Sequence, residues 1–177
     1  RTSPIDKLNL NRVFPGDPDG TPTMMIAHYV ESVLMEMADY GLDLHSGGSS
    51  LLYVPSTVST KESDPKRLKQ IKELMLAFSA PYSFFFPSGH SGGTTNHAAQ
   101  RQNVLMISTE MGGSGTVSQK CLKICEDGVQ RFLRAVGVQK KTSVPPSENT
   151  SRMLHAPNFD YFCYADGEGL FEPAISL

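Results

Sequence analysis

The sequence predicts an α/β fold in which helices cover both faces of a central sheet. Segments with apolar residues at helical spacing alternate along the chain with short apolar segments of strand length. Stretches rich in glycine, proline or serine separate them, as expected for the connections between such elements. With 177 residues, the chain can form one domain, or one domain and a fragment, around a buried core.

Three long helices are predicted from their capping residues. The first begins after Thr21 with Pro22 in its first turn, the second begins after Asp64, and the third begins after Ser118. In each case the apolar residues that follow fall on one helix face, which we expect to be buried. These residues are Ile26, Tyr29, Val30, Val33, Leu34 and Met37; Leu68, Ile71, Leu74, Met75 and Phe78; and Leu122, Cys125, Val129, Phe132, Leu133 and Val136.

Short apolar segments predict the strands. One covers residues 40–44 and ends at His45, and another covers 104–109 and leads directly into Glu110. Ligands of open α/β sheets bind beyond the carboxyl ends of the strands, which makes His45 and Glu110 candidate functional residues. Other strands are expected at 51–58, 82–86, 159–164 and 170–172, with a short helix at 97–101.

Composition excludes several classes of protein. The net charge is -2 and no basic stripe is present, so a nucleic-acid partner is not expected. No apolar run approaches the ~20 residues of a membrane span, so no membrane partner is expected. The three cysteines lack the spacing of a disulfide framework, which favours a reducing, cytoplasmic location. Cys121 and Cys125 fit core thiols on one helix face better than a metal site.

His45 is the candidate metal ligand. A neutral imidazole is a good ligand for zinc, and the nearby carboxylate of Asp43 would orient it. The alternative is a histidine whose nitrogens bind loop carbonyls. A catalytic zinc site needs about three protein ligands, so His45 alone cannot form one.

Four further side chains could carry chemistry. Glu110 fits a general base acting on a metal-bound water, or a carboxylate that caps a turn. Arg12, with Asn11 beside it, fits a clamp for a carboxylate, or a loop arginine in a surface ion pair. Arg101 could stabilise developing negative charge, or be a solvated cation at a helix end.

Four motifs, in this order, resemble the aspartoacylase/succinylglutamate desuccinylase family. They are Asn-Leu-Asn-Arg-x-Phe-Pro-Gly (9–16), Asp-Leu-His-Ser-Gly-Gly (43–48), Thr-Glu-Met-Gly-Gly-Ser-Gly-Thr-Val (109–117) and Gly-Leu-Phe-Glu-Pro (169–173). Because that family shares the zinc carboxypeptidase fold, the resemblance implies a mixed central sheet followed by a small C-terminal β domain. The opening residues 1–6 are closest to the branch that includes N-acetyl-diaminobutyrate deacetylases of ectoine breakdown.

The resemblance implies a role for each matching residue. His45 matches the downstream histidine of a His/Glu/His zinc site, and Glu110 matches the general base and proton shuttle. Asn11 and Arg12 match the pair that binds the substrate carboxylate.

Three other roles follow from the same resemblance. Arg101 resembles the arginine that polarises the scissile carbonyl, and Arg1 resembles a further substrate-binding arginine. Asp43 would orient the zinc ligand His45 without binding the metal itself.

The family's first two zinc ligands come from a Gly-x-His-Gly-x-Glu motif that this sequence lacks. The chain begins at Arg1 rather than at methionine, so we expect one zinc ion whose two other ligands lie upstream of Arg1. The expected organisation is an N-terminally incomplete catalytic α/β domain (1–138), a linker (139–151) and the incomplete start of a C-terminal β domain (152–177).

The implied function is zinc-dependent hydrolysis of the amide bond of an N-acylated amino acid, a small-molecule substrate. Homo-oligomerisation is left open. Two alternatives remain at this point: a metallocarboxypeptidase acting on peptides, and a metal-free, non-catalytic binding module that keeps the pocket.

Overall fold

A five-stranded mixed sheet forms the centre of the molecule. The computed structural model describes residues 2–86, 92–141, 143–145, 147, 150–155, 159–161, 163–170 and 172. The strands are β1 (Tyr40–His45), β2 (Leu52–Thr60), β3 (Tyr82–Phe86), β4 (Leu105–Gly113) and β5 (Arg152–His155), in the spatial order β1-β4-β2-β3-β5. Only the β2–β4 pair is antiparallel among these neighbours. The predicted α/β fold with a mixed sheet is confirmed.

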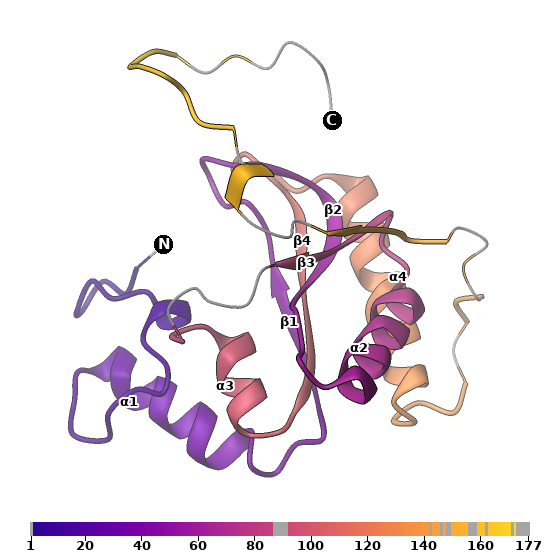
Figure 1. Ribbon diagram of the computed structural model, residues 1–177, viewed down its shortest axis with the longest axis horizontal. Helices are drawn as coiled ribbons and strands as arrows, with labels where there is room; N and C mark the ends of the chain where they lie inside the picture. The colour runs from indigo at the N-terminus through magenta and orange to yellow at the C-terminus, as the bar shows by residue number, and fades with distance from the viewer. Residues whose placement is uncertain are drawn as a thin grey trace.

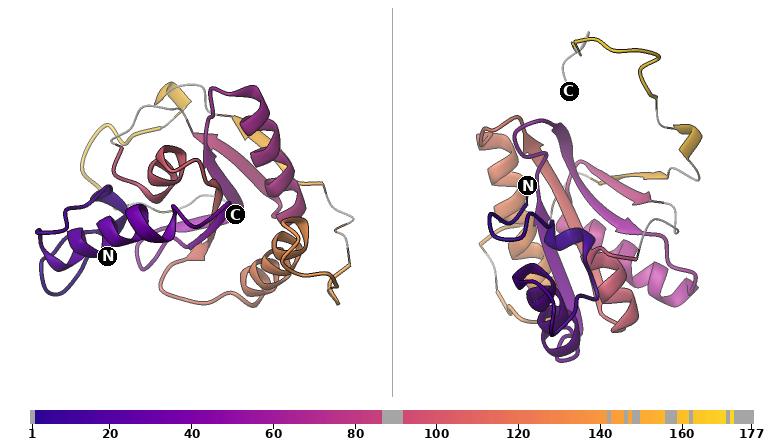
Figure 2. Two further views of the ribbon diagram at one scale, coloured as in Figure 1. Left: turned by 90° about the horizontal axis from the view of Figure 1, so that it is seen from below. Right: turned by 90° about the vertical axis from the view of Figure 1, so that its left-hand side faces the viewer.

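Helices lie on both faces of the sheet, as predicted (Figure 1). The helices are α1 (Pro22–Tyr29), α2 (Pro65–Phe78), α3 (Thr95–Arg101) and α4 (Gln119–Ala135), with a π-helical segment η2 (Val30–Leu34) and the short 3-10 helices η1 (Leu10–Arg12) and η3 (Phe159–Tyr161). Leu105 and Ile107 of β4 pack under α2 and α4, whereas Met106 packs on the side of α1 and α3. Figure 2 shows the two helical layers from below and from the side.

The second and third predicted helices begin at their predicted caps, although Phe132 is the one buried residue of the predicted α4 stripe and Leu122 is 40% exposed. Asp64 caps α2, because its carboxylate accepts a hydrogen bond from the Lys66 N–H at 2.9 Å. Ser118 caps α4 through the Cys121 N–H at 3.4 Å. Most of the predicted α2 stripe is fully buried, namely Ile71, Leu74, Met75 and Phe78.

Gly128 explains how closely α4 approaches α2. The ring of Phe78 lies where a β-carbon at position 128 would have to be. Phe78 is completely buried, so its ring has no free space to move into. A glycine inside a helix normally costs stability, and here it permits direct contact between the two helices.

The first predicted helix forms, but the wrong face was predicted to be buried. Ile26 is 53% exposed and Met37 is 74% exposed, whereas the buried residues of this segment include Ala27 and Glu31. Glu31 is held inside by an ion pair with Arg101 of α3. This long-range pairing orients the helix more strongly than its apolar stripe does.

The C-terminal strands differ from the prediction. Arg152–His155 forms β5, which pairs with the outer edge of β3 and so joins the central sheet at the point where a second domain was expected to start. Phe159–Tyr161 is a 3-10 helix instead of a strand, and residues 163–170 contain no strand. The edge of β3 offers unpaired backbone groups, and Arg152–His155 satisfies them.

Replacing Gly128 with alanine should destabilise the protein by about 1–3 kcal/mol, because the new methyl group would overlap the buried Phe78 ring. Urea denaturation measures the change. The matched control is Glu126→Ala on the exposed side of α4, which should change stability by less than about 0.5 kcal/mol. Equal stability of wild type and Gly128→Ala would contradict the packing described here.

Candidate active site

The parallel pairing of β1 with β4 creates the site. Asp43 lies opposite Ser108 and His45 lies opposite Glu110. Because side chains alternate along a strand, these four residues share one face of the sheet. Asn96 of α3 donates a hydrogen bond to the Ser108 hydroxyl at 2.9 Å, so this is the face that α3 covers. His45 is the last residue of β1, as predicted, whereas β4 continues past Glu110.

A polar cavity of 690 Å³ opens beside His45 and Glu110. Asn11 and Arg12 enter it from η1, so the cavity brings together four of the predicted site residues from three separate elements. Its remaining walls come mainly from the loops after β1 and β4. They are Asn9, Ser46, Gly47, Gly48, Ser50, Leu51, Tyr53, Gly115, Thr116 and Val117.

Asp43 holds the His45 ring. The Nε2 atom lies 2.8 Å from the Asp43 carboxylate, and this bond, against the opposing effect of burial, raises the pKa of His45. Burial works to raise the pKa of Asp43, but hydrogen bonds with His45 and Thr95 outweigh it and lower that pKa. With Nε2 committed to Asp43, Nδ1 is the ring nitrogen left to bind another group.

Glu110 lies between the polar cavity and an apolar recess of 550 Å³ that Tyr53, Phe84 and Phe86 help to line. Burial raises the pKa of Glu110, and the nearby charge of His45 only partly offsets this. Among the described residues, its Oε2 atom is buried without a hydrogen-bond partner. A carboxylate with a raised pKa and a vacant lone pair is suited to accept a proton.

Arg12 lies on the exposed side of the cavity. One guanidinium nitrogen donates to the Asn11 carbonyl at 2.6 Å. Gly93 packs directly against the backbone of η1. It lies so close to the Arg12 carbonyl that a β-carbon at position 93 would clash with that carbonyl. The Phe14 N–H also donates to the Gly93 carbonyl at 3.2 Å.

Arg101 does not line the cavity. Its Nε and Nη2 atoms donate to the two carboxylate oxygens of Glu31 at 2.7 and 2.8 Å, and Nη1 donates to the Gly92 carbonyl at 2.7 Å. Glu31 is only 4% exposed. Each of the three guanidinium nitrogens of Arg101 therefore makes a hydrogen bond, and Arg101 holds the segment that packs behind Arg12.

Thr95 is the contact residue that the sequence did not single out from the polar loop 87–95. Its N–H donates to Asn11 Oδ1 at 2.8 Å and its hydroxyl lies 2.6 Å from Asp43 Oδ2. The neighbouring Thr94 instead caps α3 and contacts His97. Nothing in the local sequence distinguishes the two threonines, because the partners of Thr95 come from distant segments.

Residues 1–136 match the model of the succinylglutamate desuccinylase/aspartoacylase catalytic domain. The chain belongs to this family. It is 37% identical, over its whole length, to N-alpha-acetyl-L-2,4-diaminobutyric acid deacetylase of Halomonas elongata, and the match covers 52% of that protein. The chain therefore spans about half the length of this curated relative.

Solved structures of family members have the same fold. The product-bound ectoine utilization protein EutE of Ruegeria pomeroyi aligns with the whole chain at 37% identity and a TM-score of 0.92, over 53% of its own length. The succinylglutamate desuccinylase/aspartoacylase of Rhodobacter sphaeroides aligns with 98% of the chain at 32% identity and a TM-score of 0.89, over 52% of its own length.

Some residues singled out from the family motifs lie outside the described ranges. Arg1 is one, and Phe171 and Pro173 of the C-terminal motif are others. Within the described ranges, no helix is long and apolar enough to cross a bilayer.

The described residues fit one ligand of a zinc site rather than a whole site. They contain no group of three His, Cys, Asp or Glu side chains that could hold a metal ion. His45 fits a single ligand position, because Asp43 holds one ring nitrogen and the other is left for a metal. His28 and Glu31 have His-x-x-Glu spacing, but Glu31 is bound to Arg101.

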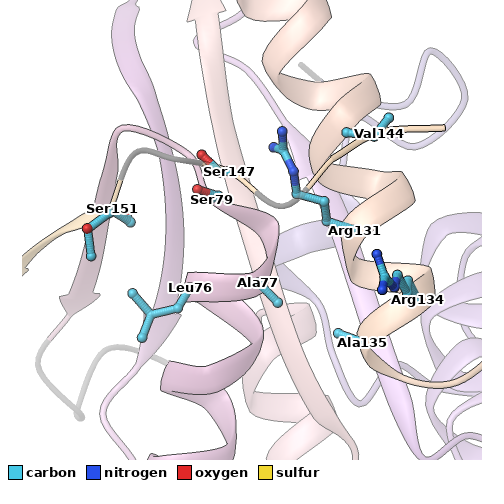
Figure 3. Close-up of a pocket in the computed structure, with 10 residues that line it drawn as sticks. Leu76, Ala77, Ser79, Arg131, Arg134, Ala135, Val144, Ser147 and Ser151 are labelled. Atoms are coloured by element: carbon cyan, nitrogen blue, oxygen red, sulfur yellow. The ribbon is translucent and has the colours of Figure 1, made fainter. Parts of the chain in front are cut away.

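A second pocket, of 490 Å³, lies between the C-terminal parts of α2 and α4 and the segment after α4 (Figure 3), and it shares no lining residue with the polar cavity. Arg131 and Arg134 line it together with Ser79 and Ser151. Among the described residues, its lining includes no carboxylate or histidine, so those residues offer no general base.

Replacing Arg101 with alanine should destabilise the protein by about 3 kcal/mol, because it leaves the buried carboxylate of Glu31 without its partner. The Glu31→Ala/Arg101→Ala double variant should lose less than the two single losses added together. Urea denaturation of the four proteins measures this coupling. Additive losses would show that the two side chains do not stabilise each other.

Proposed function

We propose that this chain carries the substrate-binding and proton-transfer groups of a hydrolase that cleaves the amide bond of an N-acylated amino acid. The observation that supports this most directly is the shared cavity of Arg12, Asn11, His45 and Glu110. A cationic clamp for a carboxylate and a carboxylate with a raised pKa then face the same space. The name of the Halomonas relative, a deacetylase, agrees with this chemistry.

We further propose that the active protein holds one zinc ion, with His45 as one ligand and two ligands from outside the described residues. When bound, zinc would lower the pKa of a water molecule and polarise the acyl carbonyl. Asp43 would fix the His45 ring so that the correct nitrogen faces the metal.

In the proposed mechanism Glu110 moves the proton. Its buried carboxylate takes a proton from the attacking water and later delivers it to the nitrogen of the departing amine. The vacant Oε2 atom is the acceptor position.

Arg12 and Asn11 would hold the substrate by its carboxylate. The Arg12 guanidinium reaches the exposed side of the cavity and can pair with both oxygens of the anion. Holding the substrate there brings its amide bond next to Glu110 and makes the attack effectively unimolecular. Arg101 is assigned no step in this mechanism, because it does not line the cavity and its three nitrogens donate to Glu31 and the Gly92 carbonyl.

Glu110→Gln in the native gene product should lower the kcat for an N-acetyl amino acid by about 10²- to 10⁴-fold with little change in KM. The side-chain amide of the introduced glutamine cannot accept the proton of the attacking water. N-acetyl-2,4-diaminobutyrate is the first substrate to assay, with a peptide in parallel to test the carboxypeptidase alternative. Near wild-type turnover would rule out the proposed role of Glu110.

Stability of the metal-free chain provides a control for folding of that variant. Because the folded pKa of Glu110 is above its ordinary value of 4.5, ionisation of this group destabilises the fold as pH rises through that range. Glu110→Gln removes the effect, so it should be at least as stable as wild type at pH 7, and the difference should vanish in acid. A destabilised variant would indicate misfolding instead of lost chemistry.

Arg12→Ala should raise KM about 10- to 100-fold while kcat changes less, because the arginine contacts the substrate and not the reacting bond. Arg12→Lys should recover part of the loss, since lysine restores the charge but not the paired geometry. Steady-state kinetics with the N-acetyl amino acid and with its carboxamide analogue measure the effect. An unchanged KM in Arg12→Ala would remove the carboxylate clamp from the proposal.

A further inference from the structure

Thr95, the first residue of α3, contacts two residues of the candidate site, Asn11 and Asp43. Its backbone N–H donates to Asn11 Oδ1 at 2.8 Å. Its hydroxyl oxygen lies 2.6 Å from Asp43 Oδ2 and 3.1 Å from Asn11 Oδ1. These partners are 84 and 52 residues away along the chain, so a single residue bridges two distant segments.

The hydroxyl has one proton and two acceptors in reach. The bond to Asp43 is shorter and is made to a charged carboxylate, so the proton belongs there. Asn11 Oδ1 is then served mainly by the Thr95 N–H. Asp43 receives two donors on Oδ2, one from Thr95 and one from His45, and together they fix its rotation.

The same contacts decide which way the Asn11 amide faces. With Oδ1 turned to Thr95, the NH₂ group faces His45, and its nitrogen lies 3.5 Å from His45 Nε2. That ring nitrogen donates to Asp43, so it cannot also accept from Asn11. The Asn11 NH₂ group keeps its donors for a ligand in the cavity.

We propose that Thr95 is a positioning residue that fixes Asn11 and the Asp43–His45 pair relative to each other. Its N–H sets the substrate-binding amide, and its hydroxyl sets the carboxylate that holds the His45 ring. The kinetic part of this proposal rests on the proposed amidohydrolase function. The structural part concerns only the placement of three side chains.

Thr95→Val in the native gene product separates the two roles, because valine keeps the shape and the N–H but lacks the hydroxyl. The expected result is a kcat about 10- to 100-fold lower with KM changed less than about threefold, since Asn11 keeps its partner. Thr95→Ser should restore kcat to within about threefold of wild type. Steady-state kinetics with N-acetyl-2,4-diaminobutyrate measure both constants.

Thr94→Val is the matched control. It removes the side-chain cap of α3 without touching Asn11 or Asp43, so it should leave kcat and KM within about threefold of wild type. Equal losses in Thr95→Val and Thr95→Ser would indicate a packing effect and overturn the proposal. So would wild-type kcat in Thr95→Val.

A crystal structure of Thr95→Val tests the placement without any substrate. The Asp43 carboxylate and the His45 ring should leave their positions, while the Asn11 amide stays. Unmoved Asp43 and His45 would overturn the proposal whatever reaction the protein catalyses. A wild-type protein without deacylase activity would instead overturn the proposed function, and the structural result would still decide the role of Thr95.

Discussion

The parallel register of β1 and β4 is the constraint on which the site depends. It places His45 opposite Glu110 and Asp43 opposite Ser108, on the face that α3 covers. A slip of one residue between the strands would put His45 and Asp43 of β1 on the opposite face from Glu110 and Ser108 of β4. β4 is also paired on its other side with β2, which lies opposite Glu110 at Ser56, so the register is fixed from both edges. The cavity, the buried carboxylate and the histidine contact all follow from this pairing.

Where local chemistry decides the structure, the sequence was sufficient. Asp64 and Ser118 start α2 and α4 because their side chains cap the first turn, and the α2 stripe is buried as its spacing indicates. The strand ending at His45 was also predicted correctly, since a short apolar segment followed by a glycine-rich loop is typical of a buried strand. The ordered motifs then identified the family, which the match over residues 1–136 establishes.

Where a residue far away in the chain determines how a side chain is placed, the sequence alone did not predict that placement. The apolar stripe of α1 pointed the wrong way because Glu31 is drawn inward by Arg101, 70 residues later. Arg101 was expected at the site, whereas it lies outside the lining of the cavity and donates to Glu31 and the Gly92 carbonyl. Thr95 could not be separated from Thr94, and the local sequence did not reveal that Arg152–His155 pairs with β3.

The bridge between Glu31 and Arg101 has a consequence for the order in which the molecule assembles. Contacts between residues so far apart in the chain close large loops, which costs entropy before any contact is gained. Thr95 joins Asn11 across a still longer stretch. The packed layer of α2 and α4 relies on nearer segments, so it can form before the layer of α1 and α3 docks. We therefore expect the cavity to be completed late in folding, and we expect it to open under mild stress before the core around α2 and α4 does.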